Sequence, residues 1–559
     1  MIAPATRATR RILALVAVVA ASFAPDTPAQ PLLAANAAGP FGLYPASHFR
    51  IVAGHLCGDC PASRQARWYF RDEIIAVPVA GRPVAGFTPG VTAFDDLRQW
   101  IAARPAAAPI DYPPLVWVAA PLVAQGARLA VDGTHVQIGD AAIEARAVEK
   151  IPLNRSYYDA SSIAWLAQHP LTVRGTLAGH TLVMRTLWPA DFTVGPVAPA
   201  PRPLPVAAST GLALRELMRE MPRGGAQSPY AASTLWQREG AASDWTGKPV
   251  LALMVNGAQG DDDEAHGGHF AIVTGRVSAN GTIDHWLVNN FYSLDIESEK
   301  GIIAAPVPLD NYLGDLNAGQ NWYRPTHMVV AVLHDDRAAA LVQSALNRVF
   351  NQFYRHQLVY YHPDANCASI SVDVLRALGW PVRARGPSGR LLAWGSLPVV
   401  AVGERSLDKG KVAFDYLNTD QTRLLPAAAL EEAFEGLLAL SRGELPEDAG
   451  PLARLLAEDL HALAFVRIPQ FPSSRKFGDA PAVTLAEYKA RVPDDPALAQ
   501  IVPVPPRPFP ADLRDPDLLP APWHPSDFAT IVWGMVTVIG LPWLAWRAWR
   551  RQKRKRAGV

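Results

Sequence analysis

The chain has 559 residues, which is too long for one ordinary hydrophobic core, so its length predicts two or three domains. Its composition of 49% hydrophobic and 18% charged residues is globular, and only the two ends read as membrane sequence. Lysine plus arginine (52) nearly balances aspartate plus glutamate (51), so no global field favours nucleic acid or an acidic substrate.

Residues 1–37 have the layout of a secretory signal. Arginines between positions 7 and 11 precede an apolar run over 12–24, and small residues follow. A short apolar run behind basic residues is typical of an export signal. The small-x-small tripeptide at 35–37 offers a cleavage site, and an uncleaved N-terminal anchor is the alternative.

Residues 40–200 are expected to form a β-rich accessory domain. Short apolar runs such as 74–78 and 115–118 predict strands, and Asp132-Gly133 marks a turn. We expect a small sandwich or barrel here, followed by a stiff proline-rich linker over 196–205.

The chain has only three cysteines. An oxidising compartment makes Cys57 and Cys60 the expected disulfide partners, which leaves Cys367 as an odd thiol. Two alternatives for the Cys-x-x-Cys pair stay open, a redox-active pair and a metal site that includes His55.

Residues 206–470 predict an α+β domain. Apolar runs at 250–255 and 328–333 read as strands, and the Asn280-Gly281 dipeptide is a strong hairpin signal. Residues 336–354 carry apolar side chains at helical spacing.

The residues most informative about function are His269 and Cys367. His269 begins a predicted strand after two glycines, and Cys367 begins a helix that Gly379 closes. A cysteine in the first helical turn lies among free N–H groups, which stabilise a thiolate and can bind an oxyanion. A histidine at the edge of a sheet can act as the base and later as the acid.

At these residues the chain resembles the permuted NlpC/P60 papain-like cysteine hydrolases, in particular their YiiX-like and lecithin-retinol-acyltransferase-like branches. His-Phe-Ala-Ile-Val-Thr-Gly at 269–275 is similar to the histidine strand of that group, and Asn366-Cys367 is similar to its nucleophile motif. Histidine precedes cysteine, as the permuted order requires. The resemblance covers roughly 250–380 and implies Cys367 as nucleophile and His269 as base.

The resemblance also implies a polar residue that orients the histidine from the next strand. His285, Asn289 and Asn290 are the candidates. Strand alternation places His285 and Asn289 on one face, so these two are expected as catalytic residues. Asn290, like Asn366 and Gly268, is then expected to support the catalytic residues without taking part in the reaction itself.

The C-terminal part predicts a membrane anchor. Residues 471–527 are proline-rich and polar and are expected to form a tether. Residues 528–546 lack charges and carry tryptophans towards their ends, so they predict a single transmembrane helix. The basic tail at 547–559 predicts a cytoplasmic C-terminus, with the rest of the chain in the periplasm.

The sequence therefore predicts an α+β fold in which a β-rich domain precedes a papain-like domain and a C-terminal anchor follows. The expected function is a membrane-anchored periplasmic cysteine hydrolase of an amide or ester bond in an envelope substrate, either a cell-wall peptide or an acyl group. A non-catalytic envelope assembly protein and a thiol–disulfide protein that uses Cys57 and Cys60 are the alternatives. No phosphate loop, dinucleotide fingerprint or zinc-protease motif occurs, so neither a cofactor, a metal nor a nucleic-acid partner is expected.

Overall fold

The computed structural model combines helices with three β-sheets. It describes residues 34–35, 39–105, 108–150, 158–207, 209–219, 226–260, 266–294, 303–447, 449–472, 476–498 and 509–513, with short stretches between 527 and 549.

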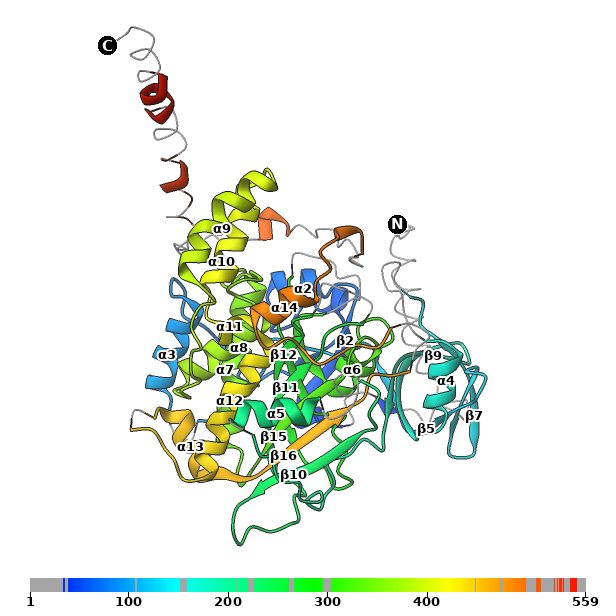
Figure 1. Ribbon diagram of the computed structural model, residues 1–559. Coiled ribbons are helices and arrows are strands. Elements are labelled where there is room, and N and C mark those ends of the chain that lie inside the picture. Colours follow the sequence, from blue (N-terminus) through cyan, green and yellow to red (C-terminus); the bar gives the residue numbers. More distant parts are fainter. Residues whose placement is uncertain are drawn as a thin grey trace, which may run out of the picture.

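A seven-stranded antiparallel sheet forms the centre of the molecule (Figure 1). In spatial order its strands are β10 (Ala231–Gln237), β16 (Leu460–Ile468), β15 (Thr326–Leu333), β11 (Pro249–Asn256), β12 (His269–Arg276), β13 (Leu287–Asn290) and β14 (Ala305–Pro308). Every residue of β11 and β15 is buried, which explains why these strands read as continuous apolar runs.

Helices cover one face of this sheet. The helices α7 (Arg337–Tyr354), α8 (Cys367–Ala377) and α12 (Pro426–Ser441) pack against β11 or β12. The remaining helices of this part are α5 (Thr210–Met218), α6 (Leu309–Gly314), α9 (Arg390–Gly403), α10 (Leu407–Asn418), α11 (Gln421–Leu424), α13 (Pro451–Asp459) and η6 (Gln320–Trp322). Helices α9 and α10 form a hairpin that projects from the body beside α14 (Figure 1).

The N-terminal part consists of two smaller units. The first is a three-stranded sheet with its adjoining helices: η3 (Ala46–His48), β2 (Phe49–Ala53), η4 (Gly54–Leu56), α2 (Arg64–Tyr69), β3 (Ile74–Pro78), α3 (Ala93–Ala103) and β4 (Val116–Trp117). The second contains β5 (Leu122–Leu129), β6 (His135–Ile138), β7 (Ala141–Ala147), α4 (Ala160–Leu166), β8 (Leu171–Ala178) and β9 (Thr181–Pro189).

The five strands of the second unit close into a ring. The first half of β5 pairs with β8 and its last residues pair with β6, while β7 and β9 pair in parallel. The register of β5 shifts between Ala124 and Ala127, where Gly126 has a φ of 66°. Such a break lets one strand bend and serve both neighbours.

Part of the range expected as a tether packs on the body. Helix α14 (Leu485–Arg491) follows a segment in which Asp479 bridges to Ala258, and the ring of Phe509 stacks on Tyr69. Two short turns, η7 (Pro496–Leu498) and η8 (Ala511–Leu513), lie in the same range.

The structure overturns the expected membrane anchor. Among the described residues, no helix is both long and apolar enough to cross a membrane. The transmembrane helix expected at 528–546 is therefore wrong as part of the fold class, as is the single-span inner-membrane location inferred from it. Positions 528–529, 531, 535 and 537–542 of that range lie outside the described residues.

Most of the expected signal segment 1–37 also lies outside the described residues. Within it, the structure describes Ala34–Ala35, which forms β1 and pairs with β5. Of the expected basic tail 547–559, only 547–549 is described.

Candidate active site

Cys367 is the first residue of α8, directly after its N-cap. The side chain of Asn366 accepts hydrogen bonds from the amides of Ala368 (2.8 Å) and Ser369 (3.0 Å). Ser369 Oγ in turn accepts from the Asn366 amide at 2.6 Å, which completes a capping box. The helix start that carries the cysteine is thus fixed by its own sequence.

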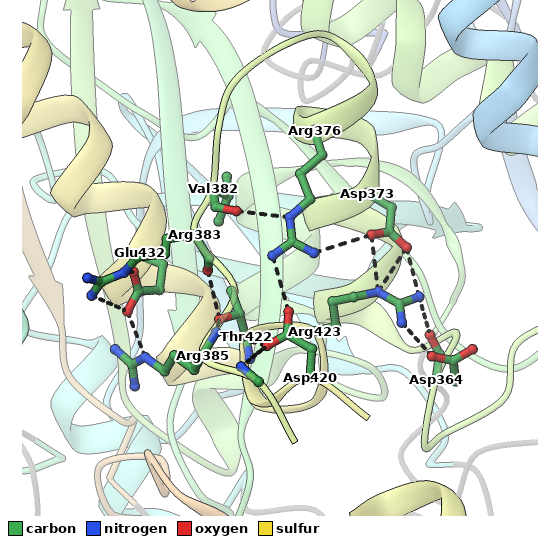
Figure 2. Close-up of polar contacts among 11 residues, drawn as sticks. Asp364, Asp373, Arg376, Val382, Arg383, Arg385, Asp420, Thr422, Arg423 and Glu432 are labelled. Atoms are coloured by element: carbon green, nitrogen blue, oxygen red, sulfur yellow. Dashed lines mark hydrogen bonds and ion pairs between the residues drawn. The ribbon is translucent and has the colours of Figure 1, made fainter. Parts of the chain in front are cut away.

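A network of charged side chains holds α8 against the neighbouring helices (Figure 2). Arg423 of α11 donates to Asp373 of α8 at 2.8 Å and to Asp364, just before the cap, at 2.5 Å. Arg376 of α8 donates to Asp420 at 3.1 Å. The start of α8 is therefore braced on both sides of Cys367.

His269 is the first residue of β12 and follows a glycine at which any side chain would be strained. Gly268 has a φ of 77°, and a Cβ there would lie 2.4 Å from the Asn256 carbonyl oxygen. Glycine is the residue that adopts this conformation without strain. It turns the chain into β12 so that the His269 ring, which is only 5% exposed, faces the region of α8.

Asn290, the last residue of β13, is hydrogen-bonded to His269. The distance from His269 Nε2 to Asn290 Oδ1 is 2.7 Å. Asn290 Nδ2 donates to the Ile303 carbonyl at 2.6 Å, so the atom of Asn290 that faces the imidazole is its side-chain oxygen. An oxygen of this kind only accepts, so the proton of a neutral His269 resides on Nε2 and Nδ1 is left as the base.

His285 and Asn289, the expected orienting residues, face other partners. His285 Nε2 lies 3.0 Å from the Arg276 carbonyl oxygen, and its Nδ1 lies 3.2 Å from Asp284. Asn289 donates to the Ile272 carbonyl at 3.1 Å and exchanges hydrogen bonds with Gln343. Asn290, expected only as a supporting residue, occupies the position beside the histidine instead.

The thiol of Cys367 and the imidazole of His269 are both electrically neutral. Burial raises the pKa of the Cys367 thiol, although the Phe270 amide and the Arg324 guanidinium oppose the rise. Burial, together with the same Arg324, lowers the pKa of His269 to about 3, against the opposing effect of its bond to Asn290. The resting pair is thus a thiol and an imidazole, and not a thiolate–imidazolium ion pair.

The Tyr360 hydroxyl beside Cys367 can stabilise an oxyanion. The cap occupies the helix-start amides of Ala368 and Ser369, and the Cys367 amide donates to the Tyr360 oxygen. The Tyr360 hydroxyl lies at this amide; burial and the adjacent thiol both raise the pKa of Tyr360, so it stays protonated. A protonated phenol whose oxygen accepts from an amide can donate its own hydrogen to an oxyanion.

Cys367 and His269 share a cavity of about 570 Å³. Its inner part is polar, with Gln259 and Arg324 beside the dyad, and the Gln259 Oε1 atom has no hydrogen-bond partner among the described residues. Its outer part runs between the α9–α10 hairpin and α14. The volume suits a small organic ligand or a segment of a larger one.

Cys57 and Cys60 form a disulfide, with their Cα atoms 5.3 Å apart, and Cys367 is the one free cysteine. Arg50 lies beside the bridge, with Nη2 at 3.6 Å from Cys60 Sγ. Neither cysteine lines the cavity that contains Cys367. The bridge and the odd thiol are therefore separate features of the molecule.

Sequence reasoning missed Arg324 and Tyr360. Arg324 precedes a strand on the far side of β11, and Tyr360 lies in a loop, so no local pattern marks either residue. A buried arginine is unusual, but its burial is visible only after folding. No family model, curated protein or solved structure matches the chain, so its function has to be argued from this site.

Proposed function

We propose that the protein is a cysteine hydrolase that cleaves an amide or ester bond, with Cys367 as nucleophile, His269 as general base and Asn290 as the residue that positions the imidazole. The observation that carries the proposal is the 2.7 Å hydrogen bond from His269 to Asn290, which leaves Nδ1 as the base. The histidine strand and the Asn-Cys helix start, on which the resemblance to permuted NlpC/P60 proteins rests, support the same assignment.

In the first half-reaction Cys367 Sγ attacks the carbonyl carbon of the substrate. His269 Nδ1 takes the thiol proton as the carbon–sulfur bond forms, because the thiol is not ionised beforehand. The Tyr360 hydroxyl, whose oxygen accepts from the Cys367 amide, donates its hydrogen to the oxyanion. When the tetrahedral intermediate collapses, the leaving amine or alcohol receives the proton from His269, and an acyl thioester remains on Cys367.

In the second half-reaction water replaces the leaving group. Neutral His269 removes a proton from water as it attacks the thioester, and returns that proton to Cys367 Sγ when the carbon–sulfur bond breaks. The net reaction consumes one water and yields the acid and the free amine or alcohol. Asn290 holds the ring in one tautomer through both steps.

The pH dependence of the reaction follows from the neutral dyad. A base must be unprotonated, and burial holds the pKa of His269 at about 3, below its ordinary 6.5. We therefore expect kcat/KM of the free enzyme to stay high from neutral pH well into the acid range. A profile whose acid limb has its midpoint near 6.5 would contradict the neutral imidazole.

The direct test is the formation of an acyl-enzyme on Cys367. Because Cys57 and Cys60 are joined, an activated ester has one free thiol to acylate, and intact-mass measurement counts the adduct. We expect a single acyl group on the wild-type protein and none on Cys367→Ala. His269→Ala should slow acylation on the order of 10²-fold, which is the typical contribution of a general base.

His285→Asn is the matched control for His269→Ala. It changes a histidine of the same hairpin whose ring nitrogens face Asp284 and a backbone carbonyl. Its acylation rate should equal that of the wild-type protein. Equal rates in wild-type protein and His269→Ala, or no adduct with any activated ester, would refute the hydrolase.

A further inference from the structure

The cavity beyond the dyad is lined by aliphatic side chains. They come from four different helical segments, namely α9, α10, the junction of α11 and α12, and α14: Val400, Val412, Ala413, Leu417, Leu424, Leu425, Pro426 and Leu485. This wall begins beside Tyr360 and His362 and extends to the solvent near the exposed Lys409 and Lys489. The apolar wall is thus continuous with the site of the chemistry.

The backbone along this wall offers little to a peptide. Val400, Val412 and Ala413 lie inside helices, where the N–H and C=O groups bond within their own helix, and the Leu417 carbonyl accepts from the Gly389 amide. The nearest strand, β12, pairs with β11 along its whole length and with β13 over 272–274, so it offers an extended peptide only a short edge beside the site, where the Phe270 amide already faces Cys367.

The polar side chains in the same region are also engaged. Ser396 Oγ donates to the Ala393 carbonyl at 2.9 Å, and the Tyr416 hydroxyl is hydrogen-bonded to His362. A bound peptide would therefore leave its own backbone groups without partners in this part of the cavity. A bound aliphatic chain carries no polar groups, so it would lose no hydrogen bonds there.

We propose that the aliphatic part of the cavity binds the acyl chain of the substrate, so that the bond cleaved is the ester or amide of a long, unbranched aliphatic acid. This inference rests on the proposed hydrolase for the cleavage step. The carbonyl carbon lies at Cys367 and the chain runs between α9–α10 and α14. The acid is released by the water-consuming step described above.

The test compares p-nitrophenyl esters of acetic, butyric, octanoic and lauric acid. Because each added methylene buries more apolar surface against the wall, kcat/KM should rise with chain length, by at least tenfold from acetate to laurate. Val400→Trp and Ala413→Trp place a large ring in the groove from two different helices. Each should lower the laurate-to-acetate ratio of kcat/KM by tenfold or more.

Val399→Trp is the matched control, because Val399 neighbours Val400 on α9 but is 72% exposed and does not line the cavity. It should keep the wild-type laurate-to-acetate ratio. Circular dichroism and thermal melting of all three variants check that each is folded, and the use of two groove variants keeps the test decisive if one of them fails to fold.

Binding of laurate to Cys367→Ala, measured by calorimetry, separates the acyl chain from the chemistry. Laurate binding that Ala413→Trp abolishes, together with no turnover of any ester, would support the acyl site and overturn the hydrolase. Turnover that is equal for acetate and laurate, with no laurate binding, would overturn the acyl chain and leave the hydrolase standing. Faster cleavage of a peptide p-nitroanilide than of the laurate ester would also overturn the proposal that the cavity binds an acyl chain.

Discussion

One amide side chain determines which nitrogen of a neutral His269 carries the proton. Asn290 uses its Nδ2 on the Ile303 carbonyl and its Oδ1 on His269, so the amide cannot turn over without losing both bonds. Both residues are almost completely buried. The hydrogen bond to this neutral acceptor raises the pKa of His269 against the larger effect of burial, and a carboxylate in its place would favour imidazolium further.

Asn290→Ala should therefore lower kcat/KM by about 10- to 100-fold, part of the usual contribution of a positioned base, because the imidazole is free to adopt the other tautomer. Asn290→Asp keeps an acceptor but adds a negative charge, which raises the pKa of His269. We expect it to restore activity near neutral pH and to move the acid limb of the profile upwards. A profile unchanged in position for Asn290→Asp would contradict this role.

Tyr360 tests the oxyanion site separately from the base. Its hydroxyl lies at the Cys367 amide and is protonated, so Tyr360→Phe removes one donor and little volume. We expect kcat to fall on the order of 10²-fold with little change in KM, because the lost hydrogen bond forms only in the transition state.

The neighbouring Tyr361→Phe is the control for that measurement. The Tyr361 hydroxyl donates to Asp415 at 2.6 Å and does not line the cavity. Its loss should lower the thermal stability and leave kcat unchanged. A rise in KM at constant kcat in Tyr360→Phe would show that the phenol binds substrate instead of the oxyanion.

At the scale of elements, α8 depends on its ion pairs with α11. Arg423 is the single cation that joins Asp364 and Asp373 on the two sides of the α8 cap (Figure 2). Burial raises the pKa of Asp373, and Arg423 is the main opposing influence. Arg376 is a second, more distant cation, 3.9 Å from Asp373, so Asp373 depends mainly on Arg423.

Arg423→Gln should lower the free energy of unfolding by about 1–3 kcal/mol, because a buried carboxylate loses a charged hydrogen-bond partner. Urea denaturation at neutral pH measures the change. Arg390→Gln is the control, since Arg390 is exposed and makes no ion pair among the described residues, and it should stay within about 0.5 kcal/mol of wild type. Equal effects of the two substitutions would contradict the inference that the ion pairs of Arg423 stabilise the start of α8.

The local signals around the site predict its two main residues but not the third. Asn366, Cys367 and Gly379 mark the start and end of α8 because capping is a property of adjacent residues. The choice between Asn289 and Asn290 depends instead on the register of β13 against β12, which is only three pairs long. A shift of one residue exchanges the two faces, so alternation alone points to Asn289, whereas Asn290 contacts His269.

That register is set by residues far away in the sequence. The connection from β12 to β13 is not a two-residue turn, and Thr282 within it bridges to Thr193 of the N-terminal part. A Cβ at Gly281 would lie 2.5 Å from the Gly195 Cα, so the two segments are in close contact. The hairpin is thus shaped by long-range packing that no pattern inside 269–290 records.

At the scale of the molecule, buried ion pairs attach the small closed sheet to the body. Arg174 of β8 pairs with Asp310 of α6, and Arg185 of β9 pairs with Asp315 just after it. Because α6 follows β14 directly, these pairs join the closed sheet to the edge of the sheet that carries His269 and Asn290. The N-terminal part therefore supports the hairpin of the site as well as contributing a surface of its own.

The stability of the whole molecule should depend on pH through a histidine outside the site. His327, in β15 at the centre of the large sheet, is completely buried, and neither ring nitrogen has a hydrogen-bond partner among the described residues. Burial, together with the nearby Arg467, lowers its pKa to about 3 from 6.5. The folded protein thus keeps His327 neutral, while the unfolded chain takes up a proton below pH 6.5.

The sign of the effect follows from proton uptake by the unfolded state. Between pH 6.5 and about 3 the unfolded chain binds one proton more at His327 than the folded protein does, so acid favours unfolding in this window. His327→Phe removes the titrating group and keeps an aromatic ring against Phe465, whose centroid is 6.1 Å away. Its stability should decline less on acidification, by about 1.4 kcal/mol per pH unit.

Urea denaturation of wild-type protein and His327→Phe at several pH values between about 4 and 7 measures this difference, and all other titrating groups cancel in the comparison. The variant should also be at least as stable as wild type at neutral pH, because two unpaired buried nitrogens are gone. His285→Phe, which alters a histidine with partners on both nitrogens, should instead be destabilising at every pH. Parallel stability curves for wild type and His327→Phe would mean that His327 is protonated in the folded protein.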